Sequence, residues 1–178
     1  SGLKANIKSR AELLAKRVSQ LYPSPKTELI HQNEMQLMVA VMLSAQTTDK
    51  KVNQITPGLF IKYKTWDDFA KADLQTLQKE IRGINFHLGK ADRLIKAGKY
   101  ITQNFHGRIP QKLVDLIKIP GVARKSANVI LQELWDIAEG IVVDTHVTRV
   151  SNRLGLTKET DAVKIERDLM GLIPKIYW

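Results

Sequence analysis

Two cations stand where a helix is expected to begin, and their position bears on chemistry. In IPGVARKSAN, residues 119–128, a Pro-Gly pair is followed at once by Arg124 and Lys125 and then by an apolar-periodic run. The helix dipole disfavours cations at this end, so helix stability does not account for them. Beside Arg124, the ammonium form of Lys125 is disfavoured, which makes its free amine available as a nucleophile. The alternative is that Lys125 is one of several lysines that contact phosphate.

The residues just before these cations predict an anion-binding hairpin. Pro120 and Gly121 suit the second and third positions of a type II turn between a short helix over 112–118 and a helix from about 124. Amides at the start of the second helix form an anion site, which the small residues Gly121 and Ala123 allow a phosphate to approach. A helix-turn-helix of the major-groove kind is the rival geometry, although its turn does not demand Pro-Gly.

A carboxylate that could act with Lys125 follows an apolar run in GIVVDTH. We expect Asp144 to be partly desolvated and to lie near the N-cap of a helix that begins near Thr145. Aspartate before threonine is also a common cap without any chemical role, and the two interpretations are compatible. If Asp144 and Lys125 face one cleft, they supply a nucleophile and an anion that stabilises positive charge developing on a sugar.

Composition narrows the classes of partner. The chain has 178 residues and a formal net charge of +10, which favours a polyanion such as nucleic acid over an acidic membrane surface. A merely basic protein is the alternative. No apolar run reaches the ~20 residues of a membrane span, and the N-terminal segment has no signal-peptide core. The chain has no cysteine and its four histidines are scattered, so we expect no metal site.

Apolar residues recur at intervals of three and four along most of the chain, which predicts an all-α fold. Examples are the sets Leu13, Leu14, Val18 and Leu21 near the start, Leu37, Val41 and Ala45, and Ala127, Ile130, Leu131 and Leu134. Four stretches together resemble the endonuclease III-type DNA glycosylases of the helix-hairpin-helix Gly/Pro-Asp superfamily. They are IPGVARKSANVIL, VVDTHVTRVSNRLGL, MLSAQTTDKKVN and GINFHLGKADRL, and the likeness covers roughly residues 10–175.

The resemblance implies two helical domains that flank a DNA-binding cleft. One is a six-helix bundle over 27–137 that contains the helix-hairpin-helix at about 113–132. The other joins 1–26 to 138–178 and lacks the family's C-terminal iron-sulfur segment. That segment carries four cysteines around a 4Fe-4S cluster, whereas this chain has none and reaches its end at PKIYW. We therefore expect no cofactor in this chain, and a cluster only if a C-terminal segment is missing.

The resemblance also implies an activity. Lys125 matches the lysine that attacks C1′ and forms a Schiff base, and Asp144 matches the essential aspartate. A lysine at this position indicates a bifunctional glycosylase and abasic-site lyase that removes oxidised pyrimidines and nicks the strand by β-elimination. The expected partner is double-stranded DNA with damaged bases or abasic sites, bound by a monomer in a prokaryotic-like cytoplasm or nucleoid. The alternatives are a non-catalytic helix-hairpin-helix module, a monofunctional glycosylase for another lesion, and a truncated partner protein.

Further residues are expected to contact DNA. Gln46 matches a glutamine that fills the space left by the flipped nucleotide, although it could be an ordinary exposed helix residue. Leu88, with its neighbours Phe86 and His87, is the candidate wedge on the opposite side, although Leu88 could instead fold onto the core. The other expected contacts come from Pro120, Gly121, Val122, Ala123, Arg124, Ser126 and His146.

Overall fold

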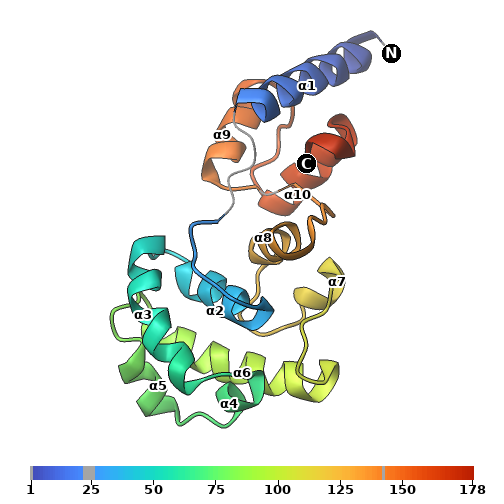
Figure 1. The fold of residues 1–178 in the computed structure, drawn as a ribbon. Coiled ribbons are helices and arrows are strands. Elements are labelled where there is room, and N and C mark those ends of the chain that lie inside the picture. The colour runs from blue at the N-terminus through green and yellow to red at the C-terminus, as the bar shows by residue number, and fades with distance from the viewer. Residues whose placement is uncertain (1, 22–26, 142) are drawn as a thin grey trace. The chain divides into compact units, whose positions relative to one another are not determined.

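The computed structural model describes residues 2–21, 27–141 and 143–178, and within these ranges the regular structure is entirely helical (Figure 1). The helices are α1 (Gly2–Leu21), α2 (Glu34–Ser44), α3 (Asp49–Lys62), α4 (Trp66–Ala70), α5 (Leu74–Glu80), α6 (His87–Phe105), α7 (Leu113–Leu116), α8 (Arg124–Trp135), α9 (Thr145–Arg153), α10 (Ala162–Leu172) and the 3-10 turn η1 (Lys175–Tyr177). The predicted all-α class is confirmed.

The chain divides into two compact units. One is Thr27–Trp135, and the other joins Ser1–Lys26 to Asp136–Trp178. In the first unit, α2 contacts α3, α6 and α8, and eight of its eleven residues are buried. A helix with neighbours on several sides is apolar around most of its circumference, as α2 is. This helix therefore forms the centre of the unit that carries the hairpin.

Four helices of Thr27–Trp135 begin at side chains that cap them. Asn33, Thr48 and Asp73 accept hydrogen bonds from backbone amides in the first turns of α2, α3 and α5. At α4, Thr65 and Asp68 form a reciprocal capping box. Such caps satisfy amides that the helix itself cannot pair, so the starting points of these helices are specified locally.

A close contact between α4 and α6 depends on a glycine. A Cβ atom on Gly98 would lie 2.6 Å from the Trp66 carbonyl oxygen and 2.7 Å from the Ala70 amide nitrogen. No side chain fits such a gap, so Gly98 allows the two backbones to meet. Beside this contact, Phe69 is fully buried and stacks on the Tyr63 ring at 4.7 Å between centroids.

The other unit has a smaller apolar core. In it α1 contacts α10 and η1, and α9 contacts α10. Its described buried apolar residues are Ala11, Ile165 and Leu169. The periodicity of 1–21 correctly indicates a helix, but Leu13 and Leu14 remain 53% and 36% exposed. Periodicity reports an apolar stripe, and whether that stripe is covered depends on the neighbouring elements.

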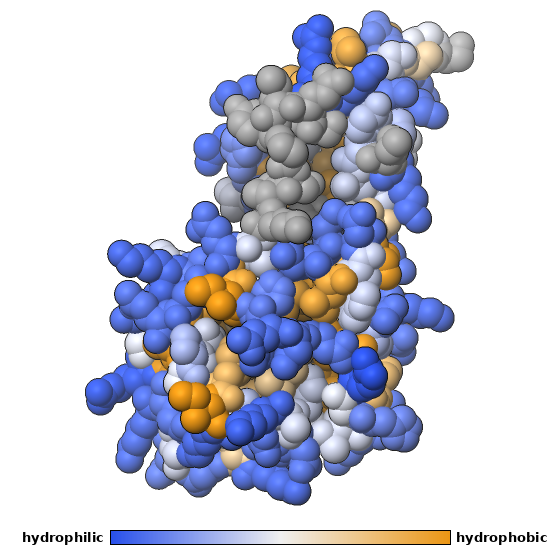
Figure 2. Space-filling model, in the orientation of Figure 1, coloured by the Kyte–Doolittle hydropathy of each residue, from blue (hydrophilic) through white to orange (hydrophobic). Residues whose placement is uncertain are grey.

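On the face drawn in Figure 2, apolar residues form small separate patches within a mostly hydrophilic surface. The exposed large apolar side chains of Thr27–Trp135 are Ile30, Ile61, Leu74, Phe86, Leu88, Val114 and Ile117. Across the described ranges, none of the helices combines the length and hydropathy needed to cross a membrane.

Candidate nucleic-acid interface

The hairpin between α7 and α8 has the predicted type II geometry. The Val122 amide donates to the Ile119 carbonyl at 3.1 Å, and Gly121 has a φ of +84°. A Cβ on Gly121 would meet Met42 Cε at 2.8 Å and Arg93 Cβ at 3.0 Å. Both the backbone angle and the close packing thus require glycine, so the turn is fixed against α2 and α6.

Helix α8 begins immediately behind this turn. The Ala123 carbonyl accepts from the Ala127 amide at 2.9 Å, which places Ala123 at the N-cap. Its methyl side chain cannot accept a hydrogen bond, so Ala123 supplies no side-chain cap to α8. Lys125 is exposed in this first turn, and Arg124 and Ser126 are half-buried. An exposed turn of backbone amides with two cations suits an anionic ligand.

Pro120 and Val122 stabilise the turn between α7 and α8. Pro120 is half-buried and occupies the second turn position, where its fixed φ favours this geometry. Val122 is buried, and its amide already donates to Ile119. The contact of Val122 with DNA stays a prediction.

Asp144 caps α9, as the sequence predicts. Its Oδ1 accepts from the Val147 amide at 2.8 Å. The expectation that this carboxylate is partly desolvated is wrong, because Asp144 is exposed. A capping side chain turns toward the open end of its own helix, where solvent reaches it. His146 lies exposed in the first turn of the same helix.

The turn after α2 places Gln46 outside a helix. Helix α2 ends at Ser44, and Gln46 is exposed with a φ of +55°, so the interpretation as an exposed helix residue is wrong. Two hydrogen bonds join this turn to the loop before α6. Asn85 donates from Nδ2 to the Gln46 carbonyl at 2.6 Å, and from its amide to Thr47 Oγ1 at 3.2 Å.

The candidate wedge residues lie directly beyond this junction. Phe86 precedes α6 with a φ of +58° and is 65% exposed, whereas Leu88 lies in the first turn and is 57% exposed. The alternative that Leu88 folds onto the core is therefore wrong. His87, the first residue of α6, is half-buried. Two apolar side chains are thus presented to solvent beside the Gln46 turn.

Sequence reasoning missed Lys90, which is buried under the same turn. It is only 5% exposed, and its Nζ donates to the Leu43 carbonyl at 2.8 Å, to the Ala45 carbonyl and to Thr47 Oγ1 at 3.3 Å. Burial, and to a smaller extent the nearby Arg93, lower the pKa of Lys90 below its ordinary value. Its burial could have been predicted from its spacing, because Lys90 lies four residues before Leu94, on the buried face of α6.

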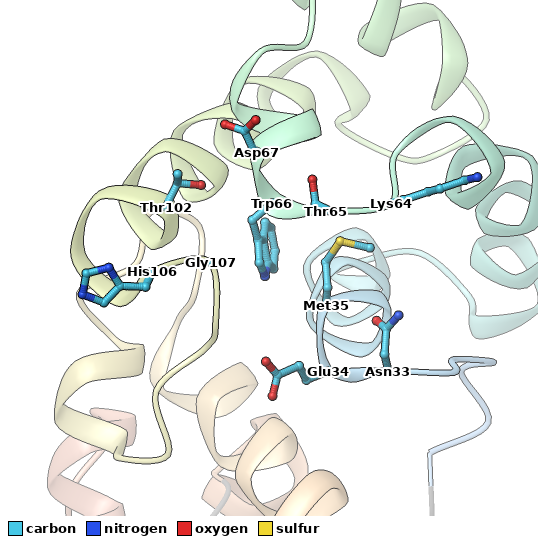
Figure 3. Close-up of a pocket in the computed structure, with 10 residues that line it drawn as sticks. All are labelled: Asn33, Glu34, Met35, Lys64, Thr65, Trp66, Asp67, Thr102, His106 and Gly107. Carbon is cyan, nitrogen blue, oxygen red and sulfur yellow. The ribbon is translucent and has the colours of Figure 1, made fainter.

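The structure also contains a pocket apart from these residues. It has a volume of about 590 Å³ and is lined by the start of α2, residues 64–67 and the end of α6. Figure 3 shows the Trp66 indole turned toward this space, where Trp66 Nε1 and Thr102 Oγ1 have no hydrogen-bond partner. No residue predicted to contact DNA lines the pocket. We therefore assign it no part in the interface.

The residues present do not fit a thiolate-bound cluster. The sequence contains no cysteine, and among the described residues no group of His, Asp and Glu could hold a metal ion.

Comparison with known proteins identifies relatives along nearly the whole chain. Residues 39–175 match the family model described as HhH-GPD superfamily base excision DNA repair protein. The chain is 44% identical to endonuclease III of Synechocystis sp. over 174 residues, which is 98% of this chain and 80% of that protein. It is 40% identical to endonuclease III of Bacillus subtilis over 168 residues, covering 94% of this chain and 76% of that protein.

Solved structures agree with these relatives. A trapped endonuclease III-DNA covalent intermediate superimposes with a TM-score of 0.86 at 37% identity, covering 96% of this chain and 80% of that one. A thermostable thymine-DNA glycosylase superimposes with a TM-score of 0.76 at 18% identity, covering 96% and 81%. The second likeness is one of fold alone.

Proposed function

The chain belongs to the HhH-GPD superfamily of base excision DNA repair proteins, and we propose that it is a bifunctional DNA glycosylase and abasic-site lyase. The family resemblance drawn from the sequence is confirmed. The observation that carries the proposal is Lys125, an exposed amine in the first turn of α8 directly behind the Pro120–Gly121 turn. The lyase reaction needs a nucleophilic amine, and the lysine of the IPGVARKSANVIL motif supplies one at this position.

The chemistry assigns separate roles to two residues. The lone pair of Lys125 Nζ attacks C1′ of the damaged nucleoside, and the glycosidic bond breaks with its electron pair leaving on the base, which takes up a proton. The attached amine then loses a proton, and its lone pair breaks the C1′–O4′ bond, so the sugar ring opens to a protonated imine while O4′ takes up a proton. The imine acidifies C2′, and loss of a C2′ proton expels the 3′ phosphate by β-elimination. Asp144, held by its bond to the Val147 amide, stabilises the positive charge that develops on the sugar.

The DNA is gripped mainly through its backbone. The first turn of α8, where Lys125 is exposed, and a net charge of +10 both favour phosphate. Gln46 enters the space of the extruded nucleotide, and Phe86 or Leu88 wedges the opposite side. Phe86 is the more exposed of the two and adjoins Asn85, which is bonded to the Gln46 turn, so we assign it the wedge.

The finer assignments follow from the same argument. Lys125 supports a lyase rather than a monofunctional glycosylase, and the endonuclease III relatives favour oxidised pyrimidines in duplex DNA as substrates. We also propose that the chain acts as a monomer on double-stranded DNA in the cytoplasm or nucleoid.

Borohydride trapping tests this function. On a duplex with one abasic site, the wild-type chain should yield a covalent adduct, and Lys125→Gln should yield none because no primary amine remains at that position. Lys118→Gln is the matched control: Lys118 pairs with Asp115 at 3.6 Å on the same hairpin, and its loss removes the same charge. An adduct that survives in Lys125→Gln contradicts the assignment. Salt-sensitive DNA binding without any wild-type adduct favours the non-catalytic module instead.

Asp144→Asn separates catalysis from capping. Asparagine caps helices about as well as aspartate, so α9 should persist while release of thymine glycol falls much more than DNA affinity. Equal losses of base release and affinity would reduce Asp144 to its structural role.

A further inference from the structure

The backbone at Gln46 is strained and needs support from its surroundings. A non-glycine residue in the left-handed region costs on the order of 1–3 kcal/mol and persists only where neighbouring contacts enforce it. The end of α2 also leaves carbonyl groups without partners inside the helix. In most proteins a glycine relieves both problems, whereas here the position carries a long polar side chain.

Lys90 supplies hydrogen-bond donors to the carbonyl groups at the end of α2. Its Nζ contacts two carbonyl oxygens, of Leu43 and Ala45, and the hydroxyl of Thr47. An ammonium has three N–H bonds, one for each of these acceptors. A buried charge without partners would cost several kcal/mol, so a lysine at 5% exposure is tolerated only because these oxygens surround it. The turn and the lysine therefore depend on each other.

Asn85 supports the same turn from the loop before α6. Its Nδ2 holds the Gln46 carbonyl, and its amide holds Thr47 Oγ1. Thr47 Oγ1 is thus shared by Lys90 and Asn85, and the Thr47 amide donates to the Ser44 carbonyl at 3.0 Å. All of these contacts lie within Thr27–Trp135. They link the backbone of Gln46 to the segment that carries Phe86.

We propose that Lys90 and Asn85 are positioning residues that fix the Gln46 turn, so that its side chain and the Phe86 loop enter the duplex as one preformed unit. The inference rests on the proposed function, since it assigns to these residues the geometry of base extrusion. Neither residue contacts the reacting atoms. Their effect reaches chemistry through Gln46, because a displacement of about 1 Å at a positioning group can cost a rate about 10²-fold.

The decisive variant is Lys90→Met, which is one atom shorter, keeps most of the apolar stem and removes all three donors. Lys96→Met is the matched control, because Lys96 lies exposed on the same helix, pairs with Asp92 at 2.8 Å and carries the same charge. Asn85→Ala removes the Nδ2 bond to the Gln46 carbonyl and leaves the bond from the backbone amide to Thr47. Because Asn85 is exposed, this variant tests the proposal even if Lys90→Met does not fold. Each variant is compared alone and combined with Gln46→Ala.

Two activity measurements separate positioning from stability. Lys90→Met should slow single-turnover release of thymine glycol about ten- to a hundredfold. Its affinity for an undamaged duplex should change less than about twofold, since the α8 amides and most phosphate contacts are untouched. In the Gln46→Ala background the same substitution should cost less than about twofold, because the residue it positions is gone. A loss of equal size in both backgrounds would overturn the proposal.

Hydrogen exchange measures how firmly the backbone of the turn is held, and it does not depend on catalysis. Amides of residues 44–48 should exchange faster in Lys90→Met and Asn85→Ala than in the wild type or Lys96→Met. Unchanged exchange in both variants would refute the support of the turn, whatever the activity. If the wild type neither releases a base nor forms an adduct, the proposed function fails, while the exchange measurement still decides whether Lys90 and Asn85 fix the turn.

Discussion

The two units of this chain differ in how their functional residues are supported. In Thr27–Trp135, the hairpin and the Gln46 turn rest on a dense core, and the largest fully buried side chains that the structure describes all lie there. In the unit that joins the two ends of the chain, Asp144 lies on α9, where only Ser151 is buried among the described helix residues. One unit holds its residues by packing, and the other holds Asp144 by a single cap.

This difference suggests a division of tasks. The grip on DNA and the insertion of side chains need rigid backbone, which close packing supplies. A carboxylate that stabilises charge needs an orientation more than a deep core, and a capping hydrogen bond provides one. The comparison predicts that substitutions with the same chemistry have unequal effects in the two units.

The largest expected effect is loss of core packing. Phe69→Ala should lower the free energy of unfolding by about 3–5 kcal/mol, because a fully buried ring is deleted. Leu13→Ala on α1 should change it by no more than about 0.5 kcal/mol, since that side chain is 53% exposed. Urea denaturation followed by circular dichroism measures both, and a comparable loss in Leu13→Ala would break the comparison.

Two glycines with positive φ, one in each unit, allow a second comparison of the two units. Gly121→Ala should cost about 2–3 kcal/mol, because a left-handed alanine there also overpacks against Arg93 and Met42. Gly155→Ala, with a φ of +69° and no atom within 4 Å of the added Cβ, should cost only about 1 kcal/mol. Thermal unfolding distinguishes these values. Equal losses would mean that backbone strain alone governs the hairpin.

A smaller effect is expected at the cap of α9. Asp144→Ala should lower the free energy of unfolding by about 1 kcal/mol. Asp144→Ser should lower it by only about 0.3 kcal/mol, because serine also caps helices. If the alanine variant is as stable as the wild type, Asp144 is not held by its cap. The unfolding free energy from denaturant titration gives the answer.

The smallest expected effect is a change in how stability depends on pH in acid. The Lys64 amide, chiefly, and hydrogen bonds from Thr65 lower the pKa of Asp68 below its ordinary 3.8. A carboxylate with a lowered pKa stabilises the fold above about pH 4, and that contribution is lost as pH falls through the lowered value. Asp68→Asn should remove it at a cost of at most about 1 kcal/mol near neutrality. Stability measured from pH 2 to 6 should then depend less on pH, and an unchanged slope would contradict the prediction.

Local signals predicted the parts of this molecule that are locally determined. Pro120–Gly121 fixed the turn type in advance, because proline sets one φ and glycine permits the other. The Asp144–Thr145 pair predicted the start of α9 for a similar reason. The four motifs identified the family, since their order along the chain adds information that no single motif holds.

Contacts between distant segments escaped this reasoning. Lys90 lies 47 residues after Leu43 in the sequence, so only the fold reveals that its amine meets the end of α2. The positive φ of Gln46 was not predicted either, because no sequence rule for glycine or asparagine points to it. The exposure of Asp144 was missed because an apolar run before a carboxylate does not determine how the carboxylate turns.

The left-handed backbone of Gln46 also constrains how this position can evolve. Glycine there would relieve the conformational penalty and raise stability, yet it would delete the side chain that we propose enters the duplex. Asparagine would ease the backbone while shortening the reach by one methylene. The free energy of unfolding and the proposed insertion thus place opposite demands on position 46, and glutamine meets the second demand at a cost to the first.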